Sequence, residues 1–460
     1  MPFALFALYV LLSYVYPGEI FPVLAPFRIT FLVALTGLGC AALWLMFKRS
    51  AQITTIQLWF LLAFTLTSVI SRMIGEAWLG AVVPAMTRFG PSLAMFVITL
   101  CSVNSLRKLR AASACIVLLS LMLVLQGIAA YHFGYKANMF LFDPTSRSEY
   151  TESVASDDDE EGYEEEEVGY SPDDEIVDDG STAVRIRGLG LLHDPNDLAL
   201  GLVMALPLLG AGWRHKAKIN NLLLVLLPSA VLIYGLFLTR SRGGALALGV
   251  LLCVAARRRF GRVAATLLFA AVIASGVASN FASGRQVSLS DEAASGRVQA
   301  WMEGFEMLKA QPLIGVGYGQ FLEHHNLTAH NSFVLCFAET GLIGYFFWLG
   351  LLVITYAQLH SLKQLSNEQP FDREIKGWAG RLQLSMIGFL AAAFFLSRTF
   401  VPMLYLLIGL GVALIVIARN ANIAVETPSV RRLGAILLAS EIGSILFIYA
   451  LIKVDLALIT

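Results

Sequence analysis

Apolar segments recur along the whole chain, and they decide its fold class. A helix needs about 20 apolar residues to cross the roughly 30 Å hydrocarbon core of a bilayer. Of 460 residues, 57% are hydrophobic and 14% are charged, whereas a soluble domain is about half apolar and a quarter charged. We therefore predict an all-α polytopic membrane protein with about 12–13 transmembrane helices. The expected helices span 2–17, 29–47, 55–73, 87–104, 111–131, 194–213, 220–239, 243–256, 262–278, 333–357, 382–398, 400–418 and 433–451.

Basic residues in the short connections set the expected orientation. Lys and Arg cluster on alternate connections, as at 107–110, 214–218 and 257–262. Such clusters are typical of the cytoplasmic side, which leaves two large loops outside. The resulting division is 1–131 for the N-terminal helices, 132–193 for the first outer loop, 194–278 for the central helices, 279–332 for the second outer loop and 333–460 for the C-terminal helices.

The two outer loops differ in composition. Fifteen of the 33 acidic residues lie between Glu152 and Asp179, with no Lys or Arg among them. This low-complexity insertion (152–179) is expected to be solvated and without fixed structure. The second loop carries Trp301, Phe305 and Leu308 at roughly helical spacing, which predicts a helix folded against the membrane surface.

Arginine dominates the outer ends of the helices. Before the last helix, the basic residues expected there are Arg28, Arg72, Arg88, Arg240, Arg242 and Arg398. Arginine binds phosphate through two parallel hydrogen bonds and tolerates partial burial better than lysine. A diphosphate ligand at the outer face would explain the absence of lysine, although interfacial snorkelling accounts for some of the six.

The segment "FLTRSRGGALALG" places Arg240, Ser241 and Arg242 in a short helix reversal. Two glycines follow and permit close approach of a ligand. Charges at such a boundary indicate a functional site. The alternative is that both arginines pair with distant carboxylates such as Glu303 or Glu339.

Two further motifs lie in the second outer loop. The stretch "SGRVQAW" puts Arg297 and Trp301 on one helix face, and "PLIGVGYGQF" alternates Gly315 and Gly317 with larger residues. Alternating glycines suit a backbone pressed against a ligand or another helix. In "AHNSF", Asn331 is a good helix N-cap, and the helix dipole beside His330 favours an anion and a neutral, proton-accepting imidazole.

The segment "LLHDPNDLALGL" gathers Asp194 and Asn196 at an expected helix start. Helix capping and substrate contact explain this cluster equally well. The histidine spacing HHxxxxH fits no standard catalytic zinc site. We therefore expect no metal and no cofactor.

In order and spacing, "LTRSRGG", "GR…W", "PLIGVGYGQF", "AHNSF" and "ETGLIG" resemble the O-antigen ligase and polymerase family of bacterial envelope glycosyltransferases. The resemblance covers about residues 191–351. It implies an undecaprenyl-diphosphate-linked glycan donor and a glycan or lipid A-core acceptor, joined at the periplasmic face of the inner membrane. The two outer loops would then be periplasmic.

The resemblance also assigns residues. It places the essential arginine on Arg242, the loop arginine on Arg297 and the histidine on His330. Arg240, Ser241, Asn331, Asp194, Asn196, Gly315 and Gly317 are the expected substrate-binding residues. Family members are understood to need neither metal nor nucleotide sugar. Expected partners are membrane lipid and envelope polysaccharide assembly proteins, with no nucleic acid.

Three alternatives stay open. Within the family, the chain is a ligase, a polymerase or a protein O-oligosaccharyltransferase. A polysaccharide or anion transporter predicts charges at the bilayer midplane and internal repeats, and neither is evident in the sequence. A scaffold that docks through the acidic insertion gives no reason for Arg242, Arg297 and His330 to converge.

Overall fold

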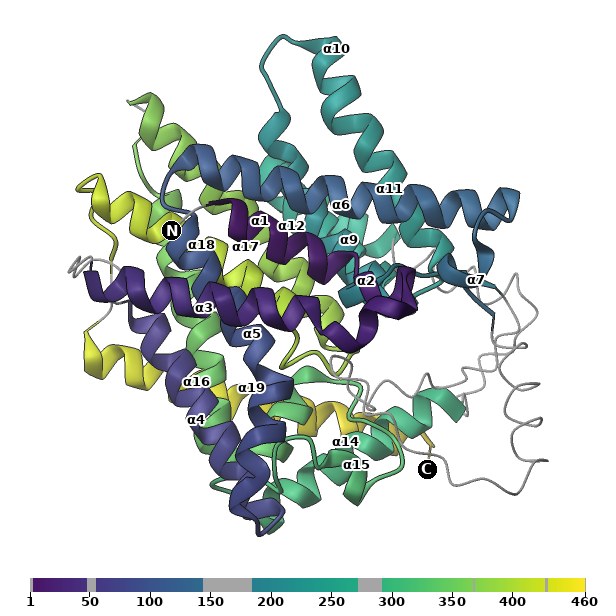
Figure 1. Cartoon of the computed structure of the whole chain (residues 1–460), viewed down its shortest axis with the longest axis vertical. Coiled ribbons are helices and arrows are strands. Elements are labelled where there is room, and N and C mark those ends of the chain that lie inside the picture. The colour runs from purple at the N-terminus through teal and green to yellow at the C-terminus, as the bar shows by residue number, and fades with distance from the viewer. Residues whose placement is uncertain are drawn as a thin grey trace.

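A computed structural model describes residues 3–47, 55–143, 184–271, 292–366, 369–426 and 429–459. The acidic insertion at 152–179 lies outside the described residues. Helices dominate the described chain (Figure 1). One small sheet joins β1 (Leu141–Phe142) to β2 (Arg185–Ile186) in an antiparallel pair.

Thirteen long helices make up most of the described chain. They are α1 (Phe3–Tyr14), α3 (Ile29–Phe47), α4 (Ile56–Gly75), α5 (Val82–Ser102), α6 (Leu106–Phe133), α9 (Pro195–Leu209), α11 (Leu227–Leu238), α12 (Arg242–Phe260), α14 (Glu292–Ala310), α16 (Ser332–Lys363), α17 (Pro370–Ala393), α18 (Pro402–Asn420) and α19 (Val430–Ile459). The shorter elements are α2 (Pro17–Ile20), η1 (Pro22–Phe27), η2 (Leu79–Ala81), α7 (Ala137–Phe140), η3 (Gly190–Leu192), η4 (Gly210–Gly212), α10 (Lys218–Asn221), η5 (Leu222–Leu226) and α15 (Phe321–His324).

The all-α polytopic membrane fold predicted from the apolar segments is confirmed. Among the described residues, nine helices are long and apolar enough to cross a membrane. The remaining predicted segments correspond to α1, α12, α17 and the helix at 262–271, which are helical but shorter or more charged. The predicted bounds of 382–398 are wrong for α17, because its first turns are hydrophilic and Pro370 starts the helix well before the apolar run.

The bundle is built around α18. Every residue from Met403 to Ala418 is buried, which makes this helix the centre of the fold. It packs against α5, α16 and α17, while α9 and α12 cover the other side of α17. At the periphery, α3, α11 and α19 expose large apolar side chains such as Leu35, Phe237 and Phe447. These exposed faces are suited to lipid contact.

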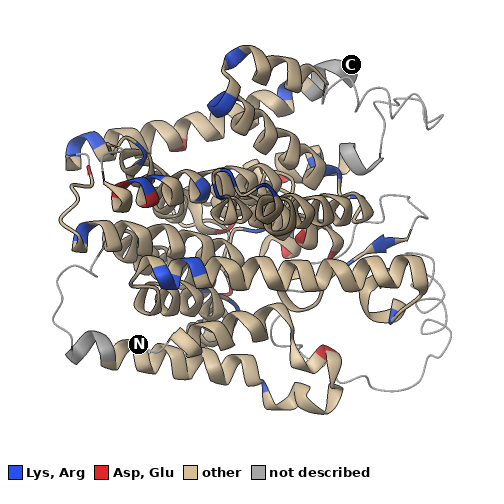
Figure 2. Ribbon diagram, turned by 90° about the horizontal axis from the view of Figure 1, so that it is seen from above, with Lys and Arg blue, Asp and Glu red and all other residues tan. Residues whose placement is uncertain are grey.

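Charged residues are distributed unevenly over the bundle. Many Lys and Arg gather at the helix ends nearest the N-terminus (Figure 2). At the other end of the bundle three helices begin with a side-chain cap: Asp194 caps α9, Ser241 caps α12 and Asn331 caps α16. We call this second end the site end. The membrane side that it faces stays a prediction.

The helix predicted in the second outer loop exists as α14. Its residues Trp301, Phe305 and Met307 are buried, and the helix packs against α16 and α19. The amphipathic spacing therefore reflects contact with the bundle. Residues 272–291, which precede α14, lie outside the described chain.

A kink in α16 receives the glycine-rich loop. At Gly341 the backbone turns to φ 63°, and the N–H groups of Leu342 and Ile343 donate to the carbonyls of Pro312 and Leu313 (2.9 and 3.2 Å). The carbonyls of Ala338 and Glu339, which those N–H groups would bond in a regular helix, accept instead from Val316 and Gly317 (3.0 and 3.2 Å). The motifs "PLIGVG" and "ETGLIG" therefore lock together through their backbones.

Candidate active site

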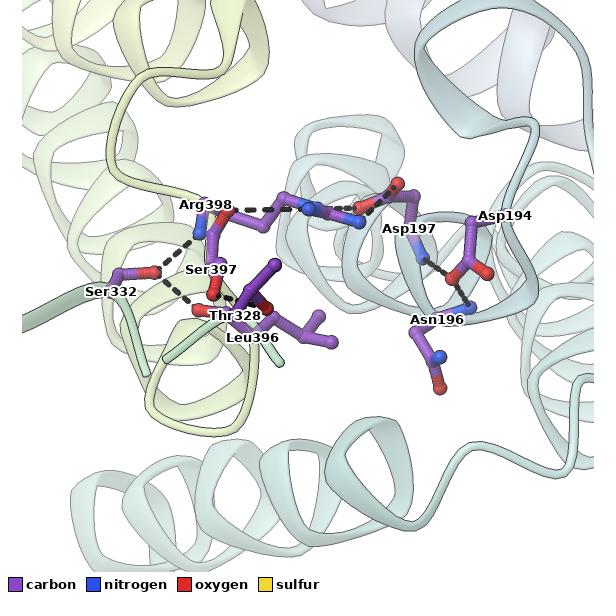
Figure 3. Close-up of polar contacts among 8 residues, drawn as sticks. All are labelled: Asp194, Asn196, Asp197, Thr328, Ser332, Leu396, Ser397 and Arg398. Atoms are coloured by element: carbon purple, nitrogen blue, oxygen red, sulfur yellow. Dashed lines mark hydrogen bonds and ion pairs between the residues drawn. The ribbon is translucent and has the colours of Figure 1, made fainter. Parts of the chain in front are cut away.

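A buried ion pair forms the centre of the site end. The guanidinium of Arg398 donates to both carboxylate oxygens of Asp197, at 2.5 and 2.9 Å (Figure 3). Arg398 lies in the connection between α17 and α18, and Asp197 lies in the first turn of α9. The two side chains are only 12% and 7% exposed. This pair therefore fixes the start of α9 against the connection.

Ser332, the first residue of α16, is bound to the same connection. Its hydroxyl donates to the carbonyl of Leu396 (2.6 Å) and accepts from the N–H of Arg398 (2.8 Å). The Thr399 hydroxyl donates to the Ser332 carbonyl (2.6 Å). Figure 3 shows Ser332 and Arg398 meeting across this turn. The N-terminus of α16 is thus bound to the connection before α18 through both the hydroxyl and the carbonyl of Ser332.

His330 lies just before this helix start and adopts a left-handed backbone conformation with φ 44°. Such a conformation costs a non-glycine residue about 1–3 kcal/mol and tends to occur at functional sites. Asn331 follows it, fully buried, and its side-chain oxygen accepts from the N–H groups of Phe333 and Val334 (2.9 and 3.3 Å). Within the described chain, the Asn331 amide nitrogen has no hydrogen-bond partner.

The reversal between α11 and α12 repeats this arrangement. Arg240 is left-handed (φ 51°) and exposed, and the next residue, Ser241, caps the helix by accepting from Gly244 N–H (3.1 Å). A Cβ atom on Gly243 would lie 3.1 Å from the Phe395 side chain, and one on Gly244 would lie 2.6 Å from Ala199. The two glycines therefore let α12 approach both α9 and the connection before α18. Arg242, the first residue of α12, is exposed.

Arg185, which the sequence did not indicate, links the end of α11 to the start of α9. Its guanidinium donates to the Thr239 carbonyl (2.8 Å) and to the Asn196 side chain (3.0 Å). Arg187, two residues on, donates to the Asn138 and Met139 carbonyls. Burial lowers the pKa of Arg187, and nearby Glu19 and Asp194 act in the opposite direction. The only sequence signal was the alternation in "VRIRG", directly after the acidic insertion.

One short connection gathers the predicted motifs. Trp301, on the helix that carries Arg297, packs edge-on against Phe394 (5.6 Å between ring centroids). Gly243 abuts Phe395, and Ser332 bonds Leu396. We call residues 394–399 the hub. Each of Arg242, Arg297 and His330 is therefore on a segment that contacts the hub.

The hub also brings the two loop motifs together. A Cβ atom on Gly296 would lie 3.4 Å from the Leu327 side chain, so Arg297 follows a residue that meets the loop before His330. The hydroxyl of Ser397 donates to that of Thr328 (3.1 Å). Arg297 is therefore placed near the loop that precedes His330 by the contact of its neighbour Gly296 with Leu327.

Other predicted residues lie in different surroundings. Asp194 caps α9 by accepting from Asn196 and Asp197 N–H (2.6 and 3.3 Å), as the capping interpretation requires. Gly315 (φ 77°) is pressed against the Glu339 backbone, and a Cβ atom on Gly317 (φ 127°) would lie 3.3 Å from the Gly75 Cα. Backbone packing accounts for both glycines. Their part in substrate binding stays a prediction.

Glu339 is not left exposed in the kink of α16. Its carboxylate accepts from the Phe321 N–H (3.3 Å), and its carbonyl accepts from the Ser71 hydroxyl (2.5 Å).

Among the described residues, no group of three or more His, Cys, Asp or Glu side chains is placed to hold a metal ion.

The electrostatics of the site end favour an anion. The N-termini of α9, α12 and α16 all adjoin the hub, and a helix N-terminus carries about half a positive charge. Asp194 and Asp197 offset this at α9. At α12 and α16 the first turns contain no acidic residue, and α12 begins with Arg242. The region between these two helix starts is therefore the more positive part of the site end.

Fold and site together define a polytopic helical membrane protein with a polar, anion-favouring site at one end of its bundle. Residues 227–349 match the family described as O-Antigen ligase, which confirms the resemblance over that segment. The matched segment contains Arg242, Arg297 and His330. It supports a membrane enzyme of the ligase and polymerase type, with a glycosyltransferase-like activity. A comparison with curated proteins found no match.

Proposed function

We propose that the protein is a bacterial inner-membrane glycosyltransferase that moves a glycan from an undecaprenyl-diphosphate carrier to a sugar hydroxyl at the periplasmic face. The observation that carries the proposal is the convergence of three segments on the hub, through Trp301–Phe394, Gly243–Phe395 and Ser332–Leu396. These segments hold Arg297, Arg242 and His330.

The diphosphate of the donor would bind between the starts of α12 and α16. Guanidinium groups form short, charge-assisted hydrogen bonds to phosphate oxygens, and the helix N-termini add positive potential. Arg242 and Arg297 are the proposed diphosphate ligands, with Arg240 and Ser241 beside them. Because guanidinium groups can supply this charge, the proposed reaction is metal-independent.

The proposed transfer is a single displacement. The acceptor hydroxyl oxygen forms a bond to the anomeric carbon of the donor glycan as the bond from that carbon to the diphosphate oxygen breaks. The leaving undecaprenyl diphosphate keeps the electron pair, and the arginines stabilise its developing charge. A ring nitrogen of His330 takes the hydroxyl proton. Attack from the face opposite the leaving group inverts the anomeric centre.

The remaining predicted residues have supporting parts in this proposal. Asn331 holds the helix start behind His330 and offers its buried amide as a hydrogen-bond donor. Asn196, held by Arg185, and Asp194 contact the glycan. Gly315 and Gly317 keep the loop beside α16 compact. The ion pair between Arg398 and Asp197 positions the hub, and neither residue takes part in the proposed transfer reaction.

The test is complementation of a deletion strain, read out on its surface glycans. Arg242→Ala and His330→Ala should each fail to restore the glycan although the variants reach the membrane at wild-type levels. Arg110→Ala, which alters an exposed pair with Glu374 far along the chain, should restore it. Full restoration by Arg242→Ala and His330→Ala would refute the mechanism.

The phenotype of the same deletion strain separates the acceptors. Long carrier-linked chains that stay unattached identify a ligase, whereas accumulated single repeat units identify a polymerase. Loss of sugar from proteins identifies an O-oligosaccharyltransferase. An unchanged glycan profile with a lost uptake or export activity would instead favour the transporter.

A further inference from the structure

A second pair of arginines meets at the loop that follows the kink in α16. Arg72 lies in the last turn of α4, and Arg88 lies near the start of α5. A Cβ atom on Gly319 would lie 2.9 Å from Arg88 Nη1 and 3.2 Å from Arg72 Nη1. The backbone of Gly319 has φ 74°, a conformation that favours glycine. Two guanidinium groups therefore face the same point, which any side chain at position 319 would fill.

Arg72 is held in place by its neighbours. The side chain is buried, with 8% of the residue exposed, and Nε lies 2.7 Å from a carboxylate oxygen of Glu76. Gln320 donates to the same oxygen at 3.0 Å. Within the described chain, Nη1 of Arg72 has no hydrogen-bond partner. The group that points toward Gly319 is thus a buried donor with unused capacity.

Arg88, on α5, supplies a second donor. It is exposed, and no ion pair or hydrogen bond to another described residue holds it. Two guanidinium groups that approach one another repel unless an anion lies between them. Glu76 is the carboxylate paired with Arg72, which leaves the pair with an excess of one positive charge. A phosphate group has the size and the acceptor oxygens to bind both arginines.

Aromatic residues are the chain neighbours of both the arginine pair and the hub. The rings of Tyr318 and Phe400 lie 4.3 Å apart, and Phe89 packs edge-on against Phe400 at 5.7 Å. Phe400 directly follows the hub and Phe89 directly follows Arg88, and no residue assigned to the proposed active site lies on α4 or α5. The arginine pair is therefore a site apart from the proposed active site.

The residues around this site indicate what kind of molecule would carry the bound anion. The turn between α4 and α5 exposes Trp78, Leu79 and Val83, at the lower edge of Figure 1. Tryptophan beside apolar residues at a helix end is typical of the membrane–water interface. An anion bound there next to exposed apolar surface would belong to a molecule with a lipid tail.

We propose that Arg72, Arg88 and the Gly319 turn form a second anion site, which binds the phosphate of a lipid-anchored molecule. A polyprenyl diphosphate and an anionic phospholipid share this chemistry. The assignment does not depend on the transfer reaction, because it is carried by residues outside the proposed active site.

The test counts bound lipids on the full-length protein in phosphatidylcholine nanodiscs. The probes are farnesyl diphosphate and short-chain phosphatidylglycerol, and native mass spectrometry reads their stoichiometry and affinity. Arg88→Gln should remove one bound lipid or weaken its binding roughly ten- to hundredfold, as expected for lost charge-assisted hydrogen bonds. Arg110→Gln, at an exposed arginine that pairs with Glu374, should leave binding unchanged.

Glu76→Gln gives a prediction of opposite sign. The amide that replaces the Glu76 carboxylate has nearly the same shape, but the competing negative charge beside Arg72 is gone, so anion binding should tighten. A purely structural role of Glu76 would predict weaker binding or no change. Because Arg88 is exposed, its substitution is not expected to impair folding.

Each outcome decides the assignment. Preferential saturation by farnesyl diphosphate identifies a polyprenyl diphosphate ligand, and preferential saturation by phosphatidylglycerol identifies a phospholipid headgroup. Equal binding by wild type, Arg88→Gln and Glu76→Gln would overturn the site. If Arg242→Ala loses transfer but still binds lipid at this second site, the second site is upheld. A failure of the second site can therefore be told apart from a failure of the proposed function.

Discussion

The ion pair between Arg398 and Asp197 should contribute far more to stability than a surface pair. Its side chains are 12% and 7% exposed, so Arg398→Gln would remove the guanidinium from a carboxylate with little access to water. Breaking a buried pair on one side costs about 3–5 kcal/mol. The pair between Arg110 and Glu374 is also doubly hydrogen-bonded, but Arg110 is 57% exposed, and such pairs contribute about 0–1 kcal/mol.

The measurement is the free energy of unfolding in detergent micelles, followed by tryptophan fluorescence during titration with SDS. Arg398→Gln should lower it by several kcal/mol and Arg110→Gln by less than about 1 kcal/mol. Asp197→Asn combined with Arg398→Gln should be less destabilising than Arg398→Gln alone, because the uncompensated charge is gone. Comparable losses for Arg398→Gln and Arg110→Gln, or strictly additive effects of the two substitutions at the buried pair, would refute this reasoning.

Substitutions at four further positions test the local geometry. Asn331→Ala should lower the free energy of unfolding by about 1 kcal/mol, because the helix cap is lost. Asn331→Asp keeps an acceptor oxygen and should lower it by less. Unfolding in SDS measures both values. Gly341→Ala should lower the melting temperature, because φ at this position is 63° and the added methyl group would strike Leu313. Gly434→Ala, in open space within α19, should instead raise stability by up to about 1 kcal/mol. A stabilising Gly341→Ala together with a destabilising Gly434→Ala would contradict the kink. His330→Gly should relieve backbone strain of about 1 kcal/mol and still abolish transfer, so an active His330→Gly enzyme would exclude the histidine as proton acceptor.

The helices were predictable because their apolar runs are long. All thirteen predicted segments overlap helices of the described chain, and the segment at 29–47 matches α3 in both bounds. The error at α17 has a physical cause: its hydrophilic first turns, from Pro370 to Arg381, carry no apolar signal for a membrane span. Composition identifies the part of a helix that lies in lipid more readily than the part that projects from it.

The site was predictable only where a motif is local. Asn331 caps α16 as its residue type suggests. Ser241, which we expected among the substrate-binding residues, caps α12. Arg398 pairs with Asp197, 201 positions away, and Arg185 bonds the Thr239 carbonyl, 54 positions away. Such partners follow from tertiary packing, and one sequence contains no signal for them.

The alternating glycines illustrate the same limit. Their spacing predicted a backbone pressed against a ligand or a helix and left that choice open. In the structure, Gly315 and Gly317 lie against the kinked α16 and the end of α4, whereas Gly319 lies beside two arginines. Three equivalent positions in the sequence therefore have two different surroundings.

The most direct test of the central claim is transfer by the purified protein with a synthetic undecaprenyl-diphosphate-linked glycan and a glycan acceptor. Released undecaprenyl diphosphate and transferred glycan are quantified in the same reaction. We predict equal amounts of both products for the wild type, and neither product above background for His330→Ala or Arg242→Ala. Wild-type rates in either variant, or glycan transfer without release of undecaprenyl diphosphate, would contradict the proposed active site.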